Sequence, residues 1–182
     1  MDLNAIIAAL KARCASFGGR VAGAAEYKRL PEAANLDLPA AYVIPLDENP
    51  EPAQNQNSYR QIVSDSVAVV VVLSNTADER GQGSITSVCA IRAELWAALL
   101  GWEPDADHGR VEYEGGQLLD LDRARLYYQF EFSAETEIDE GDTWQGGSNA
   151  ALPAFTEVGL TVNVPGTPDT VEATATIPVP QT

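Results

Sequence analysis

The sequence predicts an α+β fold: an antiparallel sheet of about four strands with helices packed on one face, plus an extended C-terminal arm. Apolar residues recur at helical spacing in two segments, one at the N-terminus and one in the middle of the chain. Other segments alternate between apolar and polar residues or are continuously apolar, which is typical of strands. After Ile138 the composition changes, and the chain becomes rich in Gly, Thr and Pro.

The first predicted helix covers residues 2–16. Asp2 or Asn4 can cap its N-terminus, and the Gly18-Gly19 pair ends it. Its apolar residues share one face: Leu3, Ile6, Ile7, Leu10 and Cys14. Residues 19–25, which follow, are expected to form an edge strand that turns into a helical turn.

Two strands are predicted next. Residues 40–46 have the composition of a buried strand, and residues 47–57 that of a polar loop. Residues 58–73 form one long strand, which alternates in its first half and is continuously apolar over residues 67–73. This pattern indicates a central strand that is covered on both faces at one end and exposed at the other.

The second predicted helix covers residues 84–100 and ends at Gly101. Except for Arg92, its core stripe is apolar: Ile85, Val88, Cys89, Leu95, Trp96 and Leu99. Residues 110–113 and 117–121 are expected to be strands joined by a tight turn at Gly115-Gly116. Residues 125–136 alternate strongly and predict another strand.

The chain is therefore expected to comprise an α+β domain over residues 1–138 and an extension over residues 139–182. Residues 159–164 and 171–177 of the extension have strand-like sequences, but the extension has few residues with which to make a core. Two interpretations stay open: an arm that orders on a partner or along a sheet edge, and a flexible tail.

The charge balance narrows the possible partners. With 11 basic and 27 acidic residues among 182, the formal net charge is -16, which disfavours binding to nucleic acid and to anionic membranes. Residues 1–30 hold five basic and two acidic residues, a net of +3, which leaves -19 for the rest. The N-terminal residues lack the pattern of a signal peptide, so we expect none, and the longest apolar run, residues 67–73, is too short to span a membrane. We therefore expect a cytosolic protein.

The residues form no catalytic, metal-binding or cofactor-binding constellation, so we do not expect an enzyme. His108 is the only histidine, and its polar surroundings (Asp105-Ala106-Asp107-His108) predict a solvated side chain. Residues 18–23 have the glycine spacing of a phosphate loop but lack the lysine that follows it. Cys14 and Cys89 are expected to be small buried thiols, and the sequence leaves open whether they touch.

Several segments, in this order, resemble the tail terminator (tail completion) proteins of tailed bacteriophages and prophages. They are residues 18–25 (GGRVAGAA), 38–46 (LPAAYVIPL), the long strand, Arg80-Gly81, 99–104 (LLGWEP), 113–119 (YEGGQLL) and 127–130 (YYQF). The resemblance covers roughly residues 1–136 and rests on the order and spacing of these segments. It does not extend to residues 137–182.

The resemblance implies a structural virion protein without catalytic residues. Such proteins are α+β domains that form a ring, commonly of six copies, on the last ring of the tail tube. The ring ends tube polymerisation and offers a surface to head-completion (neck) proteins, and genomic DNA passes through its channel without specific binding. It implies a location at the head-proximal end of the tail, with assembly in the host cytoplasm.

A head-to-tail ring needs two complementary patches on each subunit. The basic N-terminal residues and the acidic remainder are one candidate pair, through Lys11, Arg13, Arg20, Lys28 and Arg29. Because Arg and Trp are common interface anchors, the candidate assembly residues are Arg20, Tyr59, Arg60, Gln61, Arg80, Trp102 and Trp144. For Trp102 the alternative is a cap over a helix end, and for Trp144 it is simple exposure.

Two other functions stay open at this point. The first is another ring of the same particle, such as a neck or tail-tube subunit, which subunit stoichiometry would distinguish. The second is a small-ligand-binding or nucleotide-binding domain, which the incomplete phosphate loop and the single histidine disfavour.

Overall fold

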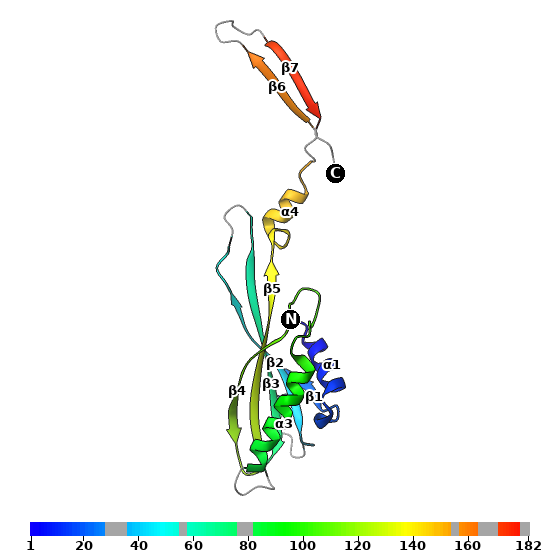
Figure 1. Cartoon of the computed structure of the whole chain (residues 1–182), viewed down its shortest axis with the longest axis vertical. Helices are drawn as coiled ribbons and strands as arrows, with labels where there is room; N and C mark the ends of the chain where they lie inside the picture. Colours follow the sequence, from blue (N-terminus) through cyan, green and yellow to red (C-terminus); the bar gives the residue numbers. More distant parts are fainter. Residues whose placement is uncertain (28–35, 55–57, 76–81, 154–156, 164–170, 179–182) are drawn as a thin grey trace. The chain divides into compact units, whose positions relative to one another are not determined.

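The computed structural model describes residues 1–27, 36–54, 58–75, 82–153, 157–163 and 171–178 (Figure 1). The chain divides into two compact units, Met1–Glu140 and Gly141–Thr182. Among the described helices, none is long and apolar enough to cross a membrane.

The first unit is built on a five-stranded sheet with the order β1-β2-β3-β5-β4. Its strands are β1 (Val21–Gly23), β2 (Ala40–Pro50), β3 (Gln61–Ser74), β4 (Glu112–Leu121) and β5 (Arg125–Ile138). The predicted α+β class is confirmed. The sheet is mixed, however, because the short β1 runs parallel to β2, while every other neighbouring pair is antiparallel.

The helices of this unit lie on both sides of the sheet. Helices α1 (Leu3–Arg13) and α3 (Gln82–Leu99) pack together on one face (Figure 1). The short α2 (Ala24–Tyr27) follows β1, and its Tyr27 packs on the opposite face against Tyr42, with ring centroids 5.7 Å apart. The predicted placement of the helices on one face therefore holds for the two long helices only.

The main core lies between α1, α3 and the sheet. Its largest fully buried side chains include Ile6, Leu10, Phe17, Leu95, Leu99, Phe130 and Phe132. The Asp2 carboxylate caps α1 by accepting hydrogen bonds from the backbone N–H groups of Asn4 and Ala5, at 2.8 and 3.2 Å. The predicted apolar face of α1 is the face that the structure buries.

Helix α3 is turned slightly from its predicted orientation. Leu95 and Leu99 are buried as expected, together with Ile91 and Ala98, which the prediction left out. Cys89 is exposed, and Trp96 is 36% exposed, so the predictions that they belong to the core are wrong. Each lies one position beyond a residue of the buried stripe, and the small Ala98 completes that stripe at helical spacing.

The predicted turn at Gly115-Gly116 is also wrong, because β4 runs without interruption from Glu112 to Leu121. Irregularities in its pairing with β5 lie between Tyr113 and Gly115 and between Leu118 and Asp120. A Cβ atom on Gly116 would lie 2.9 Å from both Tyr113 Oη and Tyr128 Cε1. This glycine therefore makes room for two tyrosine rings and does not form a turn.

Strand β2 continues beyond its predicted end at residue 46 to Pro50, into the predicted loop. All of its residues after Ile44 are exposed. Residues 48–50 pair with residues 63–65 of β3, and β3 pairs along its whole length with β5. The buried half of β3, residues 67–73, is the continuously apolar segment predicted to be covered on both faces.

The second unit contains α4 (Trp144–Ala150), β6 (Glu157–Asn163) and β7 (Val171–Pro178). Strands β6 and β7 pair antiparallel in a two-stranded sheet of their own. The two strand-like segments of the extension are thus strands. None of the residues of this unit whose exposure is described is buried.

Candidate assembly interface

Tyr59, Arg60 and Gln61 lie together at the exposed outer end of the long strands, where β3 begins. The Arg60 guanidinium donates two hydrogen bonds to the Glu137 carboxylate of β5, each 2.8 Å long. Tyr59 Oη donates to Gln61 Oε1, and Gln61 Nε2 donates to the backbone oxygen of Glu51. The predicted strand began at residue 58, whereas β3 begins at Gln61, so Tyr59 and Arg60 lie just before it.

The Arg60–Glu137 pair is open to solvent, with side chains 50% and 46% exposed. The hydrogen bond from Arg60 lowers the pKa of Glu137, and the same contact raises the pKa of Arg60. An exposed ion pair contributes little to stability. The bidentate geometry nevertheless fixes the orientation of the two side chains at this end of the strands.

Arg20 belongs to the turn between the 3-10 helix η1 (Ala15–Phe17) and β1. Its Nε donates to the backbone oxygen of Pro39 at 2.8 Å, and its Nη2 donates to that of Ser16 at 3.3 Å. These two bonds tie the turn to the residues just before β2. Arg20 is therefore engaged within the subunit.

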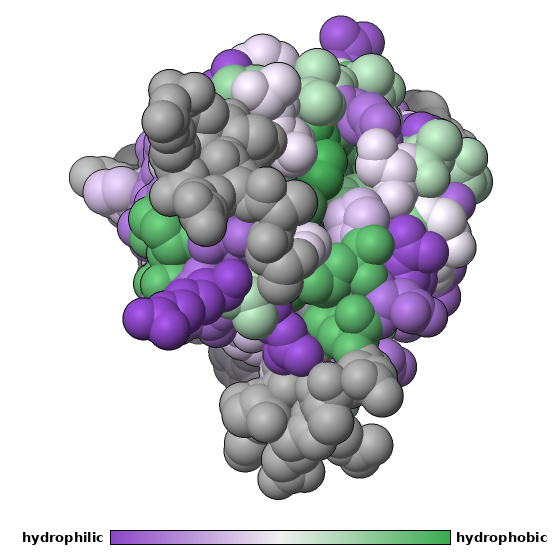
Figure 2. Space-filling model, turned by 90° about the horizontal axis from the view of Figure 1, so that it is seen from below, coloured by the Kyte–Doolittle hydropathy of each residue, from purple (hydrophilic) through white to green (hydrophobic). Residues whose placement is uncertain are grey.

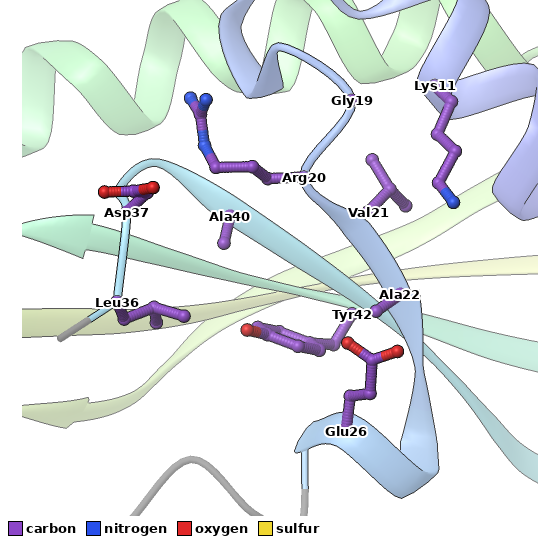
Figure 3. Close-up of a pocket in the computed structure, with 10 residues that line it drawn as sticks. All are labelled: Lys11, Gly19, Arg20, Val21, Ala22, Glu26, Leu36, Asp37, Ala40 and Tyr42. Carbon is purple, nitrogen blue, oxygen red and sulfur yellow. The ribbon is translucent and has the colours of Figure 1, made fainter. Parts of the chain in front are cut away.

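Arg20 also lines an open pocket of about 450 Å³ beside β1. Figure 3 shows its side chain close to Asp37 on one side of the pocket and Lys11 on the other. Glu26 and Tyr42 lie below them in this view. Because the charged residues are of both signs, the pocket does not select a ligand of one charge.

Trp102 and Arg13 close the C-terminal end of α3. Trp102 is partly buried against the main core, and the Arg13 guanidinium lies 5.0 Å from its ring centroid. Arg13 also donates to the backbone oxygen of Ala98 at 2.7 Å, one of the terminal carbonyls of the helix. Trp102 is therefore engaged in contacts within the subunit.

Of the remaining candidates, Trp144 begins α4 and is 85% exposed. Lys11 is exposed on α1. Arg80, Lys28 and Arg29 lie outside the described residues.

Sequence reasoning missed a partly buried polar cluster around His108. The side chain of His108 is 9% exposed, so the prediction that it is solvated is wrong. Its Nδ1 lies 2.7 Å from Asp105 Oδ1, and its Nε2 lies 2.8 Å from Asp65 Oδ2. The Met1 ammonium lies 2.8 Å from the same Asp65 oxygen, and the backbone N–H of Asp2 donates to Asp105 Oδ2.

The cluster consists of two carboxylates held by several donors. Burial opposes ionisation of Asp105, but hydrogen bonds from His108 and from the backbone N–H groups of Asp2 and Asp107 lower its pKa to about 2. At Asp65, burial raises the pKa, but hydrogen bonds from the Met1 ammonium and His108 outweigh this effect and lower the pKa.

The cluster joins the start of α1, the middle of β3 and the loop after α3. The same loop bonds to β5: Gly109 N–H donates to the backbone oxygen of Glu135, and Thr136 Oγ1 donates to that of Asp107. The sequence signal was weak. It consisted of one carboxylate, Asp65, in a strand otherwise rich in valine, and one histidine far along the chain.

A second missed feature is apolar surface on the edge strand β4. Leu118 and Leu121 are 52% and 51% exposed, and Leu119 between them is 40% exposed. Figure 2, which views the molecule from below, shows hydrophobic residues gathered among hydrophilic ones on this end. An exposed edge strand does not usually carry three leucines within four positions. This composition was the sequence signal from which the apolar surface could have been predicted.

The chain matches the family model for the phage tail terminator protein over residues 1–143. It belongs to the phage tail terminator family. The match covers every helix and strand of the first unit, from α1 to the end of β5, and it confirms the family that the sequence segments indicated. No curated protein matches the chain.

As a tail terminator, the protein is a component of the virion tail that interacts with tail and head components, and its family is a structural one. The β4 leucines, the His108 cluster and the residues at the outer end of β3 all lie within the matched region. Trp144 and the β6–β7 hairpin follow it. The extension beyond residue 143 thus lies outside the family match.

Proposed function

We propose that this tail terminator caps the tail tube as a ring of six copies, ends polymerisation of the tube and offers the surface to which head-completion proteins join. The observation that carries the proposal is the family match over the whole α+β unit. Assembly takes place in the host cytoplasm. The domain that performs this role is residues 1–138, and residues 139–182 are an appended assembly segment.

The charge of the chain suits such a ring. A channel that carries DNA benefits from acidic walls, because they let the DNA pass without sticking. The net charge of -16 supplies the acidic residues for such walls. The chain also presents different surfaces at different places, the polar outer end of β2, β3 and β5 and the leucines of β4, as a head-to-tail ring requires.

Among the candidate assembly residues, the geometry favours Tyr59, Arg60 and Gln61 for contact with a neighbouring protein of the particle. They are exposed or half-buried and grouped at the outer end of the strands. Arg20 and Trp102 have contacts within the subunit that account for their positions. Their contribution to assembly is to stabilise the fold of the subunit.

The test is electron microscopy of particles from a phage with a nonsense mutation in this gene. We expect overlong or unjoined tails beside filled heads, because the tube then lacks its stop. Tails of normal length joined to heads would contradict the proposal. Counting the copies per particle separates a terminator, present as one ring, from a tube subunit, present in large excess.

A further inference from the structure

Met1 is fixed within the first unit. Its side chain is 3% exposed and packs against the main core. The backbone N–H of Asp2 donates to Asp105 Oδ2 at 2.8 Å, and the Asp2 carboxylate caps α1. Figure 1 shows the N-terminus beside the loop that follows α3. Because residues on both sides of the Met1–Asp2 peptide bond are held, the α-amino group of Met1 has a defined position.

That position sets the α-ammonium against Asp65. The Met1 nitrogen lies 2.8 Å from Asp65 Oδ2, and the Asp65 side chain is 15% exposed. The same oxygen lies 2.8 Å from Nε2 of His108. In the described part of the chain, no Lys or Arg forms an ion pair with Asp65. The Met1 ammonium is thus the cation at this carboxylate whose charge does not depend on protonation of His108.

Asp65 cannot avoid the need for this cation. It belongs to an inner strand of the sheet and lies opposite Glu48 of β2 and Ala134 of β5. Glu48 therefore adds a second negative charge on the same face. A carboxylate that is largely shielded from water destabilises the fold unless an opposite charge compensates it.

Bacterial synthesis starts chains with N-formylmethionine, and a phage protein is made in a bacterial host. The formyl group makes the α-nitrogen an amide, which has one N–H and no charge. Hydrolysis by a host deformylase breaks the bond between this nitrogen and the formyl carbon. Water supplies the oxygen that leaves in formate, and the nitrogen takes up protons to become the ammonium.

We propose that Met1 is a modification site on which the stability of this subunit depends, because removal of its formyl group creates the ammonium that compensates Asp65. A chain that keeps the formyl group forms the same core but leaves Asp65 without this charge. The Met1–Asp65 contact lies within one subunit, so this role is separate from the ring proposed above.

Retention of the formyl group tests this role. The full-length chain is produced by bacterial cell-free translation with and without a deformylase inhibitor, and the mass of the intact chain identifies the two forms. We expect the formylated chain to have a lower urea midpoint, with an unfolding equilibrium constant raised about tenfold, as for loss of a hydrogen bond to a charged group. Equal midpoints for the two forms would overturn the proposal.

The effect should depend on Asp65. In Asp65→Asn, the formyl group should change the urea midpoint much less, because the carboxylate that faces the ammonium is gone. Asp107→Asn, which alters an exposed carboxylate of the loop, is the matched control and should keep the full effect. An equal effect in both variants would show that the formyl group acts without Asp65, which overturns the proposal.

A second measurement covers failure of Asp65→Asn to fold. The protein produced from its own gene in a bacterial host is isolated, and its N-terminal peptide is identified by mass spectrometry. We expect Met1 with a free α-amino group. A formylated or acetylated Met1, or an N-terminus at another residue, would overturn the proposal.

Discussion

The Nε2 atom of His108 lies 2.8 Å from Oδ2 of Asp65, although 43 residues separate them in the sequence. The contact joins the loop after α3 to the centre of the sheet. Asp105, which contacts the other ring nitrogen, completes a polar cluster within a domain held together otherwise by apolar packing. Its charges are mostly shielded from water, so each should affect stability measurably.

Replacing Asp105 with Asn should therefore destabilise the protein. The amide lacks the charge that faces His108 and presents one oxygen in place of two. We expect a loss of about 2 kcal/mol in the free energy of unfolding, as for hydrogen bonds to charged groups, measured by urea denaturation. Asp107→Asn is the control, because the exposed Asp107 side chain lies outside the cluster, and an equal loss in both variants would contradict the role of the cluster.

The same carboxyl groups predict how stability depends on pH. The pKa of Asp105 is about 2 in the folded protein against an ordinary value of 3.8, and the pKa of Asp65 is also lowered. The folded state thus binds fewer protons than the unfolded state in this range. Their stabilisation is complete above about pH 4 and is lost as the pH falls towards 2.

Urea midpoints measured between pH 7 and pH 2 check this dependence. The difference in stability between the native chain and Asp105→Asn should be largest near neutral pH and should shrink below about pH 4. A difference that stays constant down to pH 2 would show that the ionised carboxylate is not what stabilises the fold.

Two adjacent glycines of β4 offer a matched pair of substitutions. A Cβ on Gly116 would press on Tyr113 and Tyr128, whereas a Cβ on Gly115 would meet nothing within 4 Å. Gly116→Ala should lower the unfolding free energy by about 1–3 kcal/mol, as overpacking does, and Gly115→Ala should have little effect. Thermal denaturation of both variants measures this, and similar melting temperatures would contradict the packing at Gly116.

The bonds of Arg20 predict a loss on conservative replacement. Arg20→Lys keeps the charge but loses the planar group that reaches the backbone oxygens of Pro39 and Ser16 together. We expect a loss of about 1 kcal/mol in stability, measured by urea denaturation. Lys11→Arg, on the same side of the domain, is the control and should leave stability unchanged.

Substitution of Arg60 can distinguish an effect on assembly from an effect on stability. Because its pair with Glu137 is solvent-exposed, reversal to Arg60→Glu should change the melting temperature little. It should nevertheless reduce the fraction of tails that end at the normal length, if this end contacts a neighbouring protein. Arg110→Glu, which alters another exposed arginine, is the control, and normal assembly by the Arg60 variant would remove Arg60 from the interface.

Much of the fold was predictable from the sequence, because local periodicity reports which face of an element is buried. The face of α1, the apolar half of β3 and the strand over residues 125–136 follow directly from it. Cys89 and Trp96 were misplaced because a stripe shifted by one residue has nearly the same periodicity. The Gly115-Gly116 pair was wrongly predicted to be a turn. The need for a glycine at residue 116 comes from the nearby ring of Tyr128, which belongs to another strand.

The candidate site was less predictable for the same reason. Tyr59, Arg60 and Gln61 lie at the start of a strand whose outer end was predicted to be exposed, and the structure groups them there. The partners of His108 and the exposure of the β4 leucines depend on strand order and on the path of a loop. Neither of these is encoded in the spacing of nearby residues.

The pairing of β3 with β5 has a consequence for synthesis on the ribosome. Seven consecutive apolar residues of β3, residues 67–73, are buried only once β5 has formed beside them, and β5 ends at Ile138. Until that point has left the exit tunnel, the nascent chain exposes a valine-rich segment of the kind that self-associates. Chains that stop before β5 should therefore collect in the insoluble fraction, whereas chains that stop after residue 140 should stay in solution.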